Sequence, residues 1–428
     1  MTYTLSDNSS HLYFLAPGSQ KSTGRALSAF ILLLLFVLAG LTLIKAMHMS
    51  PHAAEQGYQG PLIITKGGTY SGNWESKDSD VPAIDIRTKE PVIIEYSNIR
   101  GAGHLIRSIG YSANITVRHS SGYGITPTPY SNYEKPRRFL NVDVFKNIVV
   151  ENCYMENTAG IYLAQRYVGD GTPQNTIRIR YNRARNIDGR IYNGLAKVQF
   201  VQFNYRGEAP HIEIAWNEVI NEPNNSAVED NINIYNSRGT VASPIRIHNN
   251  YIQGAFPFPA NAEKYTGGGI ITDSPETDST MATAYLKVYD NQLVGLGNYC
   301  LGIAGGNNIE MYRNRAIVAA RFEDNTLYSC WTGGIWAKDY YKLNSTFKNK
   351  MHHNTLGIVG QTGTWRNEIM DSTFVAAETF DNTILPEEIT PTLEKQEYEL
   401  WLNKLAHNNI RLGPQPSKAT ANKVIDYK

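Results

Sequence analysis

The sequence predicts an all-β solenoid of parallel strands from three observations: a short recurring phrase, a polar residue at one place in each copy, and a second strand between copies. The phrase alternates apolar and other residues, as in "IRIRYNRARN" at 177, "IEIAWNEVIN" at 212 and "IRIHNNYIQG" at 245. Apolar residues two apart lie on one face of a strand. Strands this short must pair with further copies of themselves, stacked about 4.8 Å apart.

The polar residue of each copy is expected in a turn, since asparagine tolerates turn dihedral angles and its amide bonds to turn backbone and to stacked neighbours. A match at Ile309, Met311 and Asn314 falls out of phase, and is interpreted as an additional strand or a coincidence. The predicted column is Ser97, Ser120, Cys153, Asn182, Asn217, Asn250, Asn291, Asn325 and Asn354.

The second strand is usually entered through glycine and alternates with the asparagine strand. Its copies are "GIYLAQ" at 160, "KVQFVQ" at 197, "NINIYN" at 231, "GIITDS" at 269, "GIAGGN" at 302 and "GIWAKD" at 334. Two strands per coil, with loops of variable length between them, are typical of a repeat architecture.

With "GGTYSGNW" at 67, "PVIIEYSNIRG" at 91 and "NITVRHSSG" at 114, the chain resembles the right-handed parallel β-helix, or pectate lyase-like, superfamily over residues 61–385. The resemblance implies a single-stranded, right-handed parallel β-helix of about ten coils. It also implies a substrate groove on the outer face of the glycine-entered strand. The D-P-H signature of alginate epimerases and the G-H-G and R-I-K signatures of polygalacturonases do not occur in the sequence, so no catalytic role is carried over.

Alternation places one side chain of each groove strand outward, where aromatic faces and amides suit a sugar chain. Ordinary packing on an exposed sheet is the alternative. The predicted sugar-binding residues are Tyr162, Gln199, Asn233, Tyr235, Trp336 and Gly306.

Asp273 and Lys338 are predicted in one column with Gly306 between them, forming a slot about 10 Å wide. For a uronate sugar, a base removes the C5 proton while a cation stabilises the charge on the carboxylate. Asp273, Lys338 and the nearby Asp230 are therefore the candidate catalytic residues. A solvated charge pair without a catalytic role is the alternative.

Oxygen ligands in a flexible loop would suit Ca²⁺, which makes Glu229, Glu276 and Asp278 a candidate calcium site. Their spacing matches no calcium motif, and a solvated acidic turn is the alternative. On the asparagine strand, the outward column Arg178, Glu213, Arg246, Lys287, Arg321 and Lys350 is mostly basic, which favours an anionic partner or an ordinary soluble face.

Residues Ala26–Ile44 are 19 uncharged, mostly apolar positions, enough to nearly span a bilayer. We expect a transmembrane helix over 26–46, a cytoplasmic tail over 1–25 and a linker over 47–60, with the main domain periplasmic or extracellular. A cleaved signal peptide is the alternative. In residues 386–428, the segment "PTLEKQEYELWLNKLAHNN" at 391 predicts a helix that caps the solenoid or binds a partner.

The composition excludes few functions. Near-balanced charge, 40 Lys+Arg against 39 Asp+Glu, provides no general attraction for nucleic acid, and no nucleic-acid motif is found. Three cysteines without C-x-x-C spacing are interpreted as buried apolar residues. The sequence thus favours a membrane-anchored protein that acts on an acidic polysaccharide. A lyase or C5 epimerase is the favoured activity, and a hydrolase is the next choice. A non-catalytic glycan-binding or scaffold protein of the cell envelope or an export complex is the alternative.

Overall fold

The computed structural model describes residues 57–126, 134–192, 194–278, 280–364 and 376–417. The chain divides into two units, Met1–Gln56 and Gly57–Lys428, and the description below concerns the second. The transmembrane helix predicted over 26–46 lies outside the described residues and stays a prediction. Within the described ranges, no helix is both long and apolar enough to cross a membrane.

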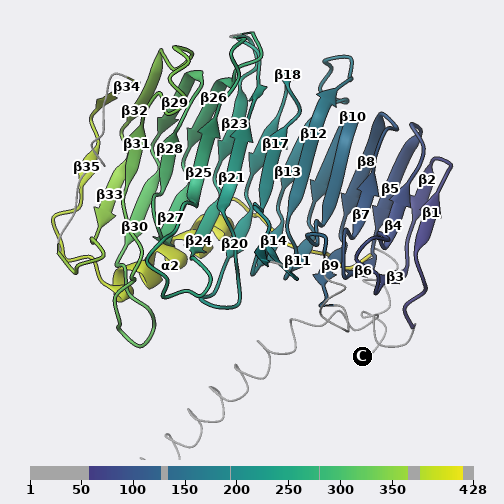
Figure 1. Cartoon of the computed structure of the whole chain (residues 1–428), viewed down its shortest axis with the longest axis horizontal. Coiled ribbons are helices and arrows are strands. Elements are labelled where there is room, and N and C mark those ends of the chain that lie inside the picture. Colours follow the sequence, from purple (N-terminus) through teal and green to yellow (C-terminus); the bar gives the residue numbers. More distant parts are fainter. Residues whose placement is uncertain (1–56, 127–133, 193, 279, 365–375, 418–428) are drawn as a thin grey trace, which may run out of the picture. The chain divides into compact units, whose positions relative to one another are not determined.

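Three ladders of parallel strands run side by side along the molecule (Figure 1). Each coil of the chain contributes a strand to each ladder in turn. The first ladder contains β1 (Leu62–Ile64), β4 (Ile84–Ile86), β7 (Ile106–Ser108), the first part of β10 (Leu140–Glu151), β12 (Ile161–Tyr167), β17 (Val201–Asn204), β21 (Asp230–Tyr235), β25 (Gly268–Asp273), β28 (Leu301–Ile303) and β31 (Ile335–Ala337).

The second ladder holds the asparagine strands. It contains β2 (Gly68–Tyr70), β5 (Pro91–Glu95), β8 (Ala113–Arg118), the second part of β10, β13 (Ile177–Arg180), β19 (Glu213–Ala215), β23 (Ile245–His248), β26 (Ala284–Tyr289), β29 (Asn307–Tyr312), β32 (Asn349–His352) and β34 (Ala377–Phe380). Because β10 runs through both ladders, they join into one 22-stranded sheet, to which β18 (Gly207–Glu208) and β22 (Ser237–Arg238) also belong.

The third ladder is an 11-stranded sheet that follows the asparagine turn. It contains β3 (Asn73–Ser76), β6 (Asn98–Gly101), β9 (Ser121–Gly124), β11 (Tyr154–Glu156), β14 (Arg183–Arg185), β20 (Glu218–Ile220), β24 (Tyr251–Ala255), β27 (Gln292–Leu296), β30 (Arg315–Val318), β33 (Thr355–Ile358) and β35 (Thr383–Ile384). A short antiparallel hairpin, β15 (Arg190–Ile191) and β16 (Gly194–Leu195), projects from a loop. The predicted all-β parallel solenoid is thus confirmed, and its right-handed sense stays the expectation of the crossover rule.

Inward side chains of the ladders stack into one continuous core. In one coil, Ile161 and Leu163 of β12 face the same interior as Ile177 and Ile179 of β13, and all are fully buried. Burying an aliphatic side chain of this size contributes about 1.5–3 kcal/mol. The alternation of apolar residues therefore fixes which face of each strand is inside.

The asparagine column forms an unbroken hydrogen-bond ladder. In each step, the backbone N–H and the side-chain Nδ2 of one asparagine both donate to Oδ1 of the next, at 2.9–3.1 Å. Each Nδ2 also donates to a strand carbonyl, as Asn182 does to Val150 at 2.9 Å. The ladder runs through Asn182, Asn217, Asn250, Asn291, Asn314, Asn354 and Asn382.

One member of the predicted column is wrong. Asn314, which appeared out of phase, belongs to the ladder, whereas Asn325 lies in an exposed turn with φ of 68°. The coil that ends at Asn314 is short, and the loop after β30 repeats the same spacing by chance in a turn closed by Phe322 and Thr326.

The corrected register also changes the charged column on the second ladder. Glu310, not Arg321, pairs with Lys287 and Lys350 in the strand register. Glu310 forms an ion pair with Lys287 at 3.5 Å, and Lys350 pairs with Glu378 at 3.7 Å. Glu213, Glu310 and Glu378 interrupt the cations, although Arg246 and Lys287 remain neighbours, so the column is of mixed charge and not mostly basic.

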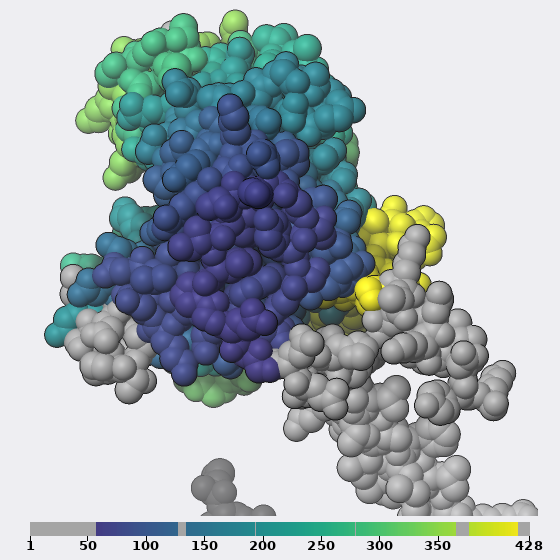
Figure 2. Space-filling model, turned by 90° about the vertical axis from the view of Figure 1, so that its right-hand side faces the viewer, coloured from purple at the N-terminus to yellow at the C-terminus, as the bar shows by residue number. Residues whose placement is uncertain are grey.

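The predicted C-terminal helix exists as α2 (Pro391–His407), but its predicted position at the end of the solenoid is wrong. It lies along the outer side of the third ladder (Figure 1), and in the view from the N-terminal end the yellow C-terminal segment stands beside the coils (Figure 2). Trp401 is fully buried and stacks on Tyr251 at 5.9 Å. The physical reason is that the third ladder offers an apolar patch, Tyr251 with Val294, that matches the buried stripe of the helix.

Candidate functional site

The outer face of the first ladder carries two rows of side chains, defined by the strand register. The first row contains Asn141, Tyr162, Gln202, Asn233, Ile271, Gly302 and Trp336. The second contains Ala164, Asn204, Tyr235 and Asp273, and it continues past the ends of β28 and β31 to Ala304 and Lys338. We call this face the groove face.

Two predicted groove residues do not lie in these rows. Gln199 precedes β17 and is buried, and Gln202 takes its place opposite Tyr162. The cause is the sequence "VQFVQF" at 198–203, in which the same triplet occurs twice and alternation cannot choose the register. Gln199 instead donates through Nε2 to Oε2 of Glu229 at 2.9 Å.

Gly306 is the second predicted groove residue that lies outside the two rows. It lies in the turn before β29 with φ of 109°, and its carbonyl accepts a hydrogen bond from Nδ2 of Asn349 at 2.9 Å. Ala304 occupies the predicted place between Asp273 and Lys338. The strand β28 is only three residues long, so the chain turns away before Gly306.

Asp230 and Asp273 are brought together by one amide. Asn233 donates through Nδ2 to Oδ2 of Asp273 at 2.9 Å and to Oδ2 of Asp230 at 3.1 Å. The hydroxyl of Tyr341 donates to Oδ1 of Asp273 at 2.7 Å, and that of Tyr299 donates to Oδ1 of Asp230. We call these five residues the carboxyl cluster.

Burial dominates the electrostatics of the carboxyl cluster. It raises the pKa of Asp230 well above its usual range, and the charge of Glu229 adds to the effect. Burial also raises the pKa of Asp273, although the hydrogen bonds from Tyr341 and Asn233 and the charge of Lys197 oppose the rise. Asp273 remains partly exposed, whereas Asp230 is 4% exposed. Asp273 is therefore the cluster's carboxyl that faces the groove.

Tyr341 fills the predicted slot. Ala304 is only 3% exposed and packs with Ile271 and Tyr299, while Trp336 and Tyr341 cover them. The backbone N–H of Tyr340 bonds to the carbonyl of Ala304 at 3.0 Å, which holds the covering loop in place. Lys338 is exposed at the end of its row.

The lysine charge that lowers the pKa of Asp273 comes from Lys197. Lys197 forms an ion pair with Glu229 at 3.0 Å, and its own pKa is raised by that contact. Lys197, Tyr299 and Tyr341 were not predicted from the sequence. Tyr299 and Tyr341 lie in loops outside the alternating pattern, where their aromatic character directly before β28 and soon after β31 was the only hint. Lys197 opens the strand copy expected at 197, but in the structure it lies in the loop before β17.

The three candidate calcium ligands each bond to different neighbouring residues and do not converge on one site. Glu229 contacts Lys197 and Gln199, and Asp278 accepts hydrogen bonds from the N–H and hydroxyl of Thr280 within its own turn. Glu276 accepts from the N–H of Thr277. In the described part of the chain, no group of three or more His, Cys, Asp or Glu side chains could hold a metal ion.

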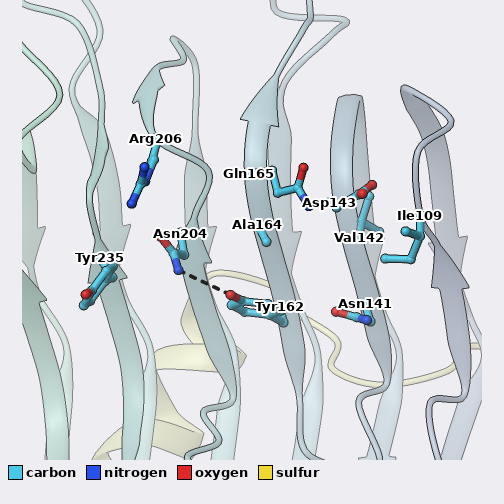
Figure 3. A pocket seen from close by; sticks show the side chains of 10 residues that line it. All are labelled: Ile109, Asn141, Val142, Asp143, Tyr162, Ala164, Gln165, Asn204, Arg206 and Tyr235. Carbon is cyan, nitrogen blue, oxygen red and sulfur yellow. Dashed lines mark hydrogen bonds between the residues drawn. The ribbon is translucent and has the colours of Figure 1, made fainter. Parts of the chain in front are cut away.

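A pocket of about 580 Å³ opens on the groove face beside the carboxyl cluster (Figure 3). Tyr162 and Asn204 lie at its centre, and Nδ2 of Asn204 donates to the hydroxyl of Tyr162 at 3.3 Å. Tyr235 lines the pocket and is paired in the strand register with Asp273. The pocket and the carboxyl cluster are therefore adjacent parts of one face. The other lining residues are Ile109, Asn141, Val142, Asp143, Ala164, Gln165 and Arg206.

Fold and site together define a parallel β-helix protein with a polar, aromatic groove across its first ladder. No family model matches the sequence, and no curated protein matches it. A similar solved structure is described as a mannuronic acid specific polysaccharide family 6 lyase from human gut microbiota, with 13% identity, 86% of this chain and 94% of that chain covered, and a TM-score of 0.36. A likeness this weak carries no argument, so the fold assignment rests on the strand pairing itself.

Proposed function

We propose that the groove face binds an acidic polysaccharide and that Asp273 exchanges a proton with a bound uronate sugar, in a lyase or C5 epimerase reaction. The observation that carries the proposal is the state of Asp273, a partly exposed carboxyl with a raised pKa, held by Tyr341 and Asn233 between aromatic groove residues. A carboxylate with a raised pKa is a stronger base, suited to proton transfer near neutral pH.

Asn233 orders the site from below the surface. It is 4% exposed, and its amide donates to both Asp230 and Asp273, which holds the two carboxyls in place. Tyr235 and Trp336, on either side of the Asp273 strand, offer rings for sugar C–H groups.

The chemistry balances with residues of the groove face. Asp273 removes the proton from C5, and the electron pair left on C5 is delocalised into the sugar carboxylate, whose charge Lys197 stabilises. In elimination, that pair forms the C4–C5 double bond and the glycosidic oxygen leaves with a proton from Tyr341. In epimerisation, a water molecule on the other face of C5 returns a proton to that carbon, and Asp273 gives its proton to the solvent, so that the charges at the start are restored.

Asp230 is assigned a positioning role in this scheme. Both carboxyls of the cluster have both oxygens hydrogen-bonded, but Asp230 is 4% exposed and nearly inaccessible, whereas Asp273 is partly exposed. A hydrolase needs two carboxyls that both reach the substrate. The burial of Asp230 therefore favours proton abstraction at C5 over hydrolysis.

The test incubates the full-length protein with a panel of uronate polymers and with neutral glycans. Unsaturated product, detected by ultraviolet absorbance, indicates a lyase, and a changed epimer ratio in the NMR spectrum indicates an epimerase. Asp273→Asn should reduce turnover about 100-fold or more while binding persists. Asp278→Asn, an exposed carboxyl in its own turn, serves as the control and should leave turnover unchanged.

Two other results would replace the proposal. New reducing ends without unsaturation would indicate a hydrolase. Binding of uronate polymers without any product, at every pH and with or without added Ca²⁺, would indicate a non-catalytic glycan-binding or scaffold protein. No binding of any glycan would remove the groove face as the functional site.

We also propose that residues 26–46 anchor the protein in a membrane, with the solenoid on the extracytoplasmic side. The apolar run Ala26–Ile44 supports this proposal. Cell fractionation of the expressed protein should find it in the membrane pellet after alkaline extraction. Release into the soluble fraction with residues 1–50 missing would indicate a cleaved signal peptide.

A further inference from the structure

We propose that the pocket at Tyr162 is a separate anion-binding subsite. It binds one acidic sugar of the polymer through Arg206 while the reacting sugar lies at Asp273. This inference rests on the proposed acidic substrate. It assigns a role to a cation that the pattern of alternating strand residues does not reveal, because Arg206 follows the end of β17.

The floor of the pocket is an aromatic ring above a buried cation. The guanidinium of Arg138 lies 5.0 Å from the ring centroid of Tyr162. Arg138 is 5% exposed, and it donates to the neutral oxygens of Ala159 at 2.8 Å, Lys197 at 3.1 Å and Gln199 at 3.5 Å. Burial lowers its pKa only to about 10, so it stays charged at neutral pH. The hydrogen-bond partners of Arg138 are neutral, but the negative charge of Glu229 also acts on it, so its attraction for an anion at the Tyr162 ring is partly offset.

The one carboxylate in the lining is already occupied. Oδ1 of Asp143 accepts hydrogen bonds from the N–H of Gly110 at 2.7 Å and from that of Val144 at 2.6 Å. These amide donors hold the Asp143 carboxylate at Gly110 and Val144, and among the described residues it makes no ion pair with Arg206. Arg206 is therefore not engaged by the carboxylate of its own pocket.

Arg206 is the cation that a ligand could reach. It is exposed, its φ of 43° lies in the left-handed region, and its side chain extends from β17 toward Tyr235 (Figure 3). Its charge also acts on Tyr235: burial and the charge of Asp273 raise the pKa of that phenol, and Arg206 opposes the rise. A guanidinium beside a tyrosine ring and the amide of Asn204 can hold a sugar carboxylate and its neighbouring hydroxyl.

The spacing makes this subsite useful for a polymer. Arg206 follows β17, and Asp273 ends β25, two ladder steps further along. At about 4.8 Å per step, their strands are roughly 10 Å apart, a reach that needs linked sugars rather than a monosaccharide. The subsite would therefore set a minimum chain length and a preference for a charged sugar on one side of the reacting residue.

The experiment measures binding of oligouronates of increasing length, and of their carboxyl-reduced neutral counterparts, to the full-length protein by calorimetry. Arg206→Ala should weaken binding of long oligouronates about tenfold or more, because a hydrogen bond to a charged group is lost. Binding of the neutral series and of the shortest oligouronates should not change. Arg206→Lys should recover part of the loss, since it keeps the charge without the planar guanidinium.

Two further variants serve as controls. Arg206→Gly removes the guanidinium and suits the positive φ, so it should fold and bind as Arg206→Ala does. Lys350→Ala removes an exposed cation from the second ladder and should bind every ligand like the wild type. Equal binding of long oligouronates by wild type, Arg206→Ala and Arg206→Gly would overturn the subsite, as would an equal loss for acidic and neutral ligands.

The outcomes also separate this inference from the proposed reaction. If no polymer is turned over but Arg206→Ala still weakens binding of long oligouronates selectively, the chemistry proposed for Asp273 is wrong and the subsite stands. If uronate polymers are turned over and the Arg206 variants match the wild type in KM and affinity, the reaction stands and the subsite is wrong.

Discussion

Asp273 shows how a single residue acquires its properties from neighbours on other coils. Its pKa is raised by burial, while donors from Asn233 on β21 and from Tyr341 after β31 stabilise its charged form. The opposing effects can be separated by experiment, because each donor can be removed without changing the carboxyl.

Tyr341→Phe removes the proton donor proposed for elimination, so turnover of a lyase should fall. It also removes one hydrogen-bond donor to the Asp273 carboxylate, so the pKa of Asp273 should rise further in the residual activity. The limb of the pH–rate profile that reflects ionised Asp273 should therefore move to higher pH, by a measurable fraction of a unit or more. Steady-state kinetics across pH on a uronate polymer measures it. Tyr340→Phe, an exposed neighbour, is the matched control, and an unmoved limb would exclude the hydrogen bond as a tuning contact.

Gly306→Leu should destabilise the protein rather than block the groove. The position has φ of 109°, and a Cβ there would lie 2.6 Å from the carbonyl oxygen of Thr283. Strain of this kind costs of order 1–3 kcal/mol. Chemical denaturation measures the loss, with Gly110→Leu, also at positive φ but with open space around it, as a control for backbone strain alone. Equal losses in both variants would remove the steric part of the argument.

At the level of elements, the asparagine ladder joins neighbouring coils at one corner. Each asparagine accepts two hydrogen bonds from the coil before it and donates to the coil after it, so the ladder satisfies groups that the turn leaves buried. The repeated spacing in the sequence reflects this requirement.

Asn250→Leu should leave the backbone N–H and Nδ2 of Asn217 without their acceptor, at a cost of about 1–3 kcal/mol for each buried group. Thermal melting or denaturant titration measures the loss. Asn325→Gly, in an exposed turn outside the ladder, should melt close to the wild type. Similar melting of both variants would show that the ladder contributes little.

The helix α2 carries an acid whose protonation is linked to its docking. Enclosure by neighbouring residues raises the pKa of Glu394 to about 7, although Oε1 accepts from the N–H of Ala319 at 2.6 Å. An acid with a raised pKa in the folded state contributes stability that is fully present below its unfolded pKa. That stability is lost as the pH rises through about 7.

Glu394→Gln should therefore stabilise the protein at pH 8 by about 1–3 kcal/mol and have little effect at pH 4.5. Melting temperature measured across this pH range tests it. Glu399→Gln, an exposed acid on the same helix, should leave the pH dependence as in the wild type. Parallel pH curves for wild type and Glu394→Gln would contradict the linkage.

In the molecule as a whole, the C-terminal segment connects distant coils. Glu397 binds Arg315 at 2.6 Å, Trp401 donates to buried Glu218 at 3.0 Å, and the following residues continue along the solenoid. The N–H of Gly413 bonds to the carbonyl of Tyr181, and Nδ2 of Asn152 bonds to the carbonyl of Arg411. One segment thus contacts coils that do not contact each other.

Truncation after Thr390 should lower stability by at least the ~3–5 kcal/mol that the loss of one large buried aromatic side chain costs. It should leave glycan binding unchanged, because the groove face lies on the first ladder and the helix on the third. Denaturation and calorimetry of the truncated protein measure both. Loss of glycan binding in a truncated protein that stays folded would show that the two faces are coupled.

The sequence by itself determined the solenoid, the asparagine ladder in most coils, the C-terminal helix, and the placing of Asn233, Tyr235 and Asp273 on one face. These follow from local periodicity, which depends only on strand geometry. The tertiary structure decided the register at "VQFVQF", the place of Gly306 and the side position of α2. It also brought Tyr341, Lys197 and Arg206 to the groove face. The physical reason is that loops of variable length separate the strands, so the point where each loop returns is set by packing against other coils and not by spacing along the chain.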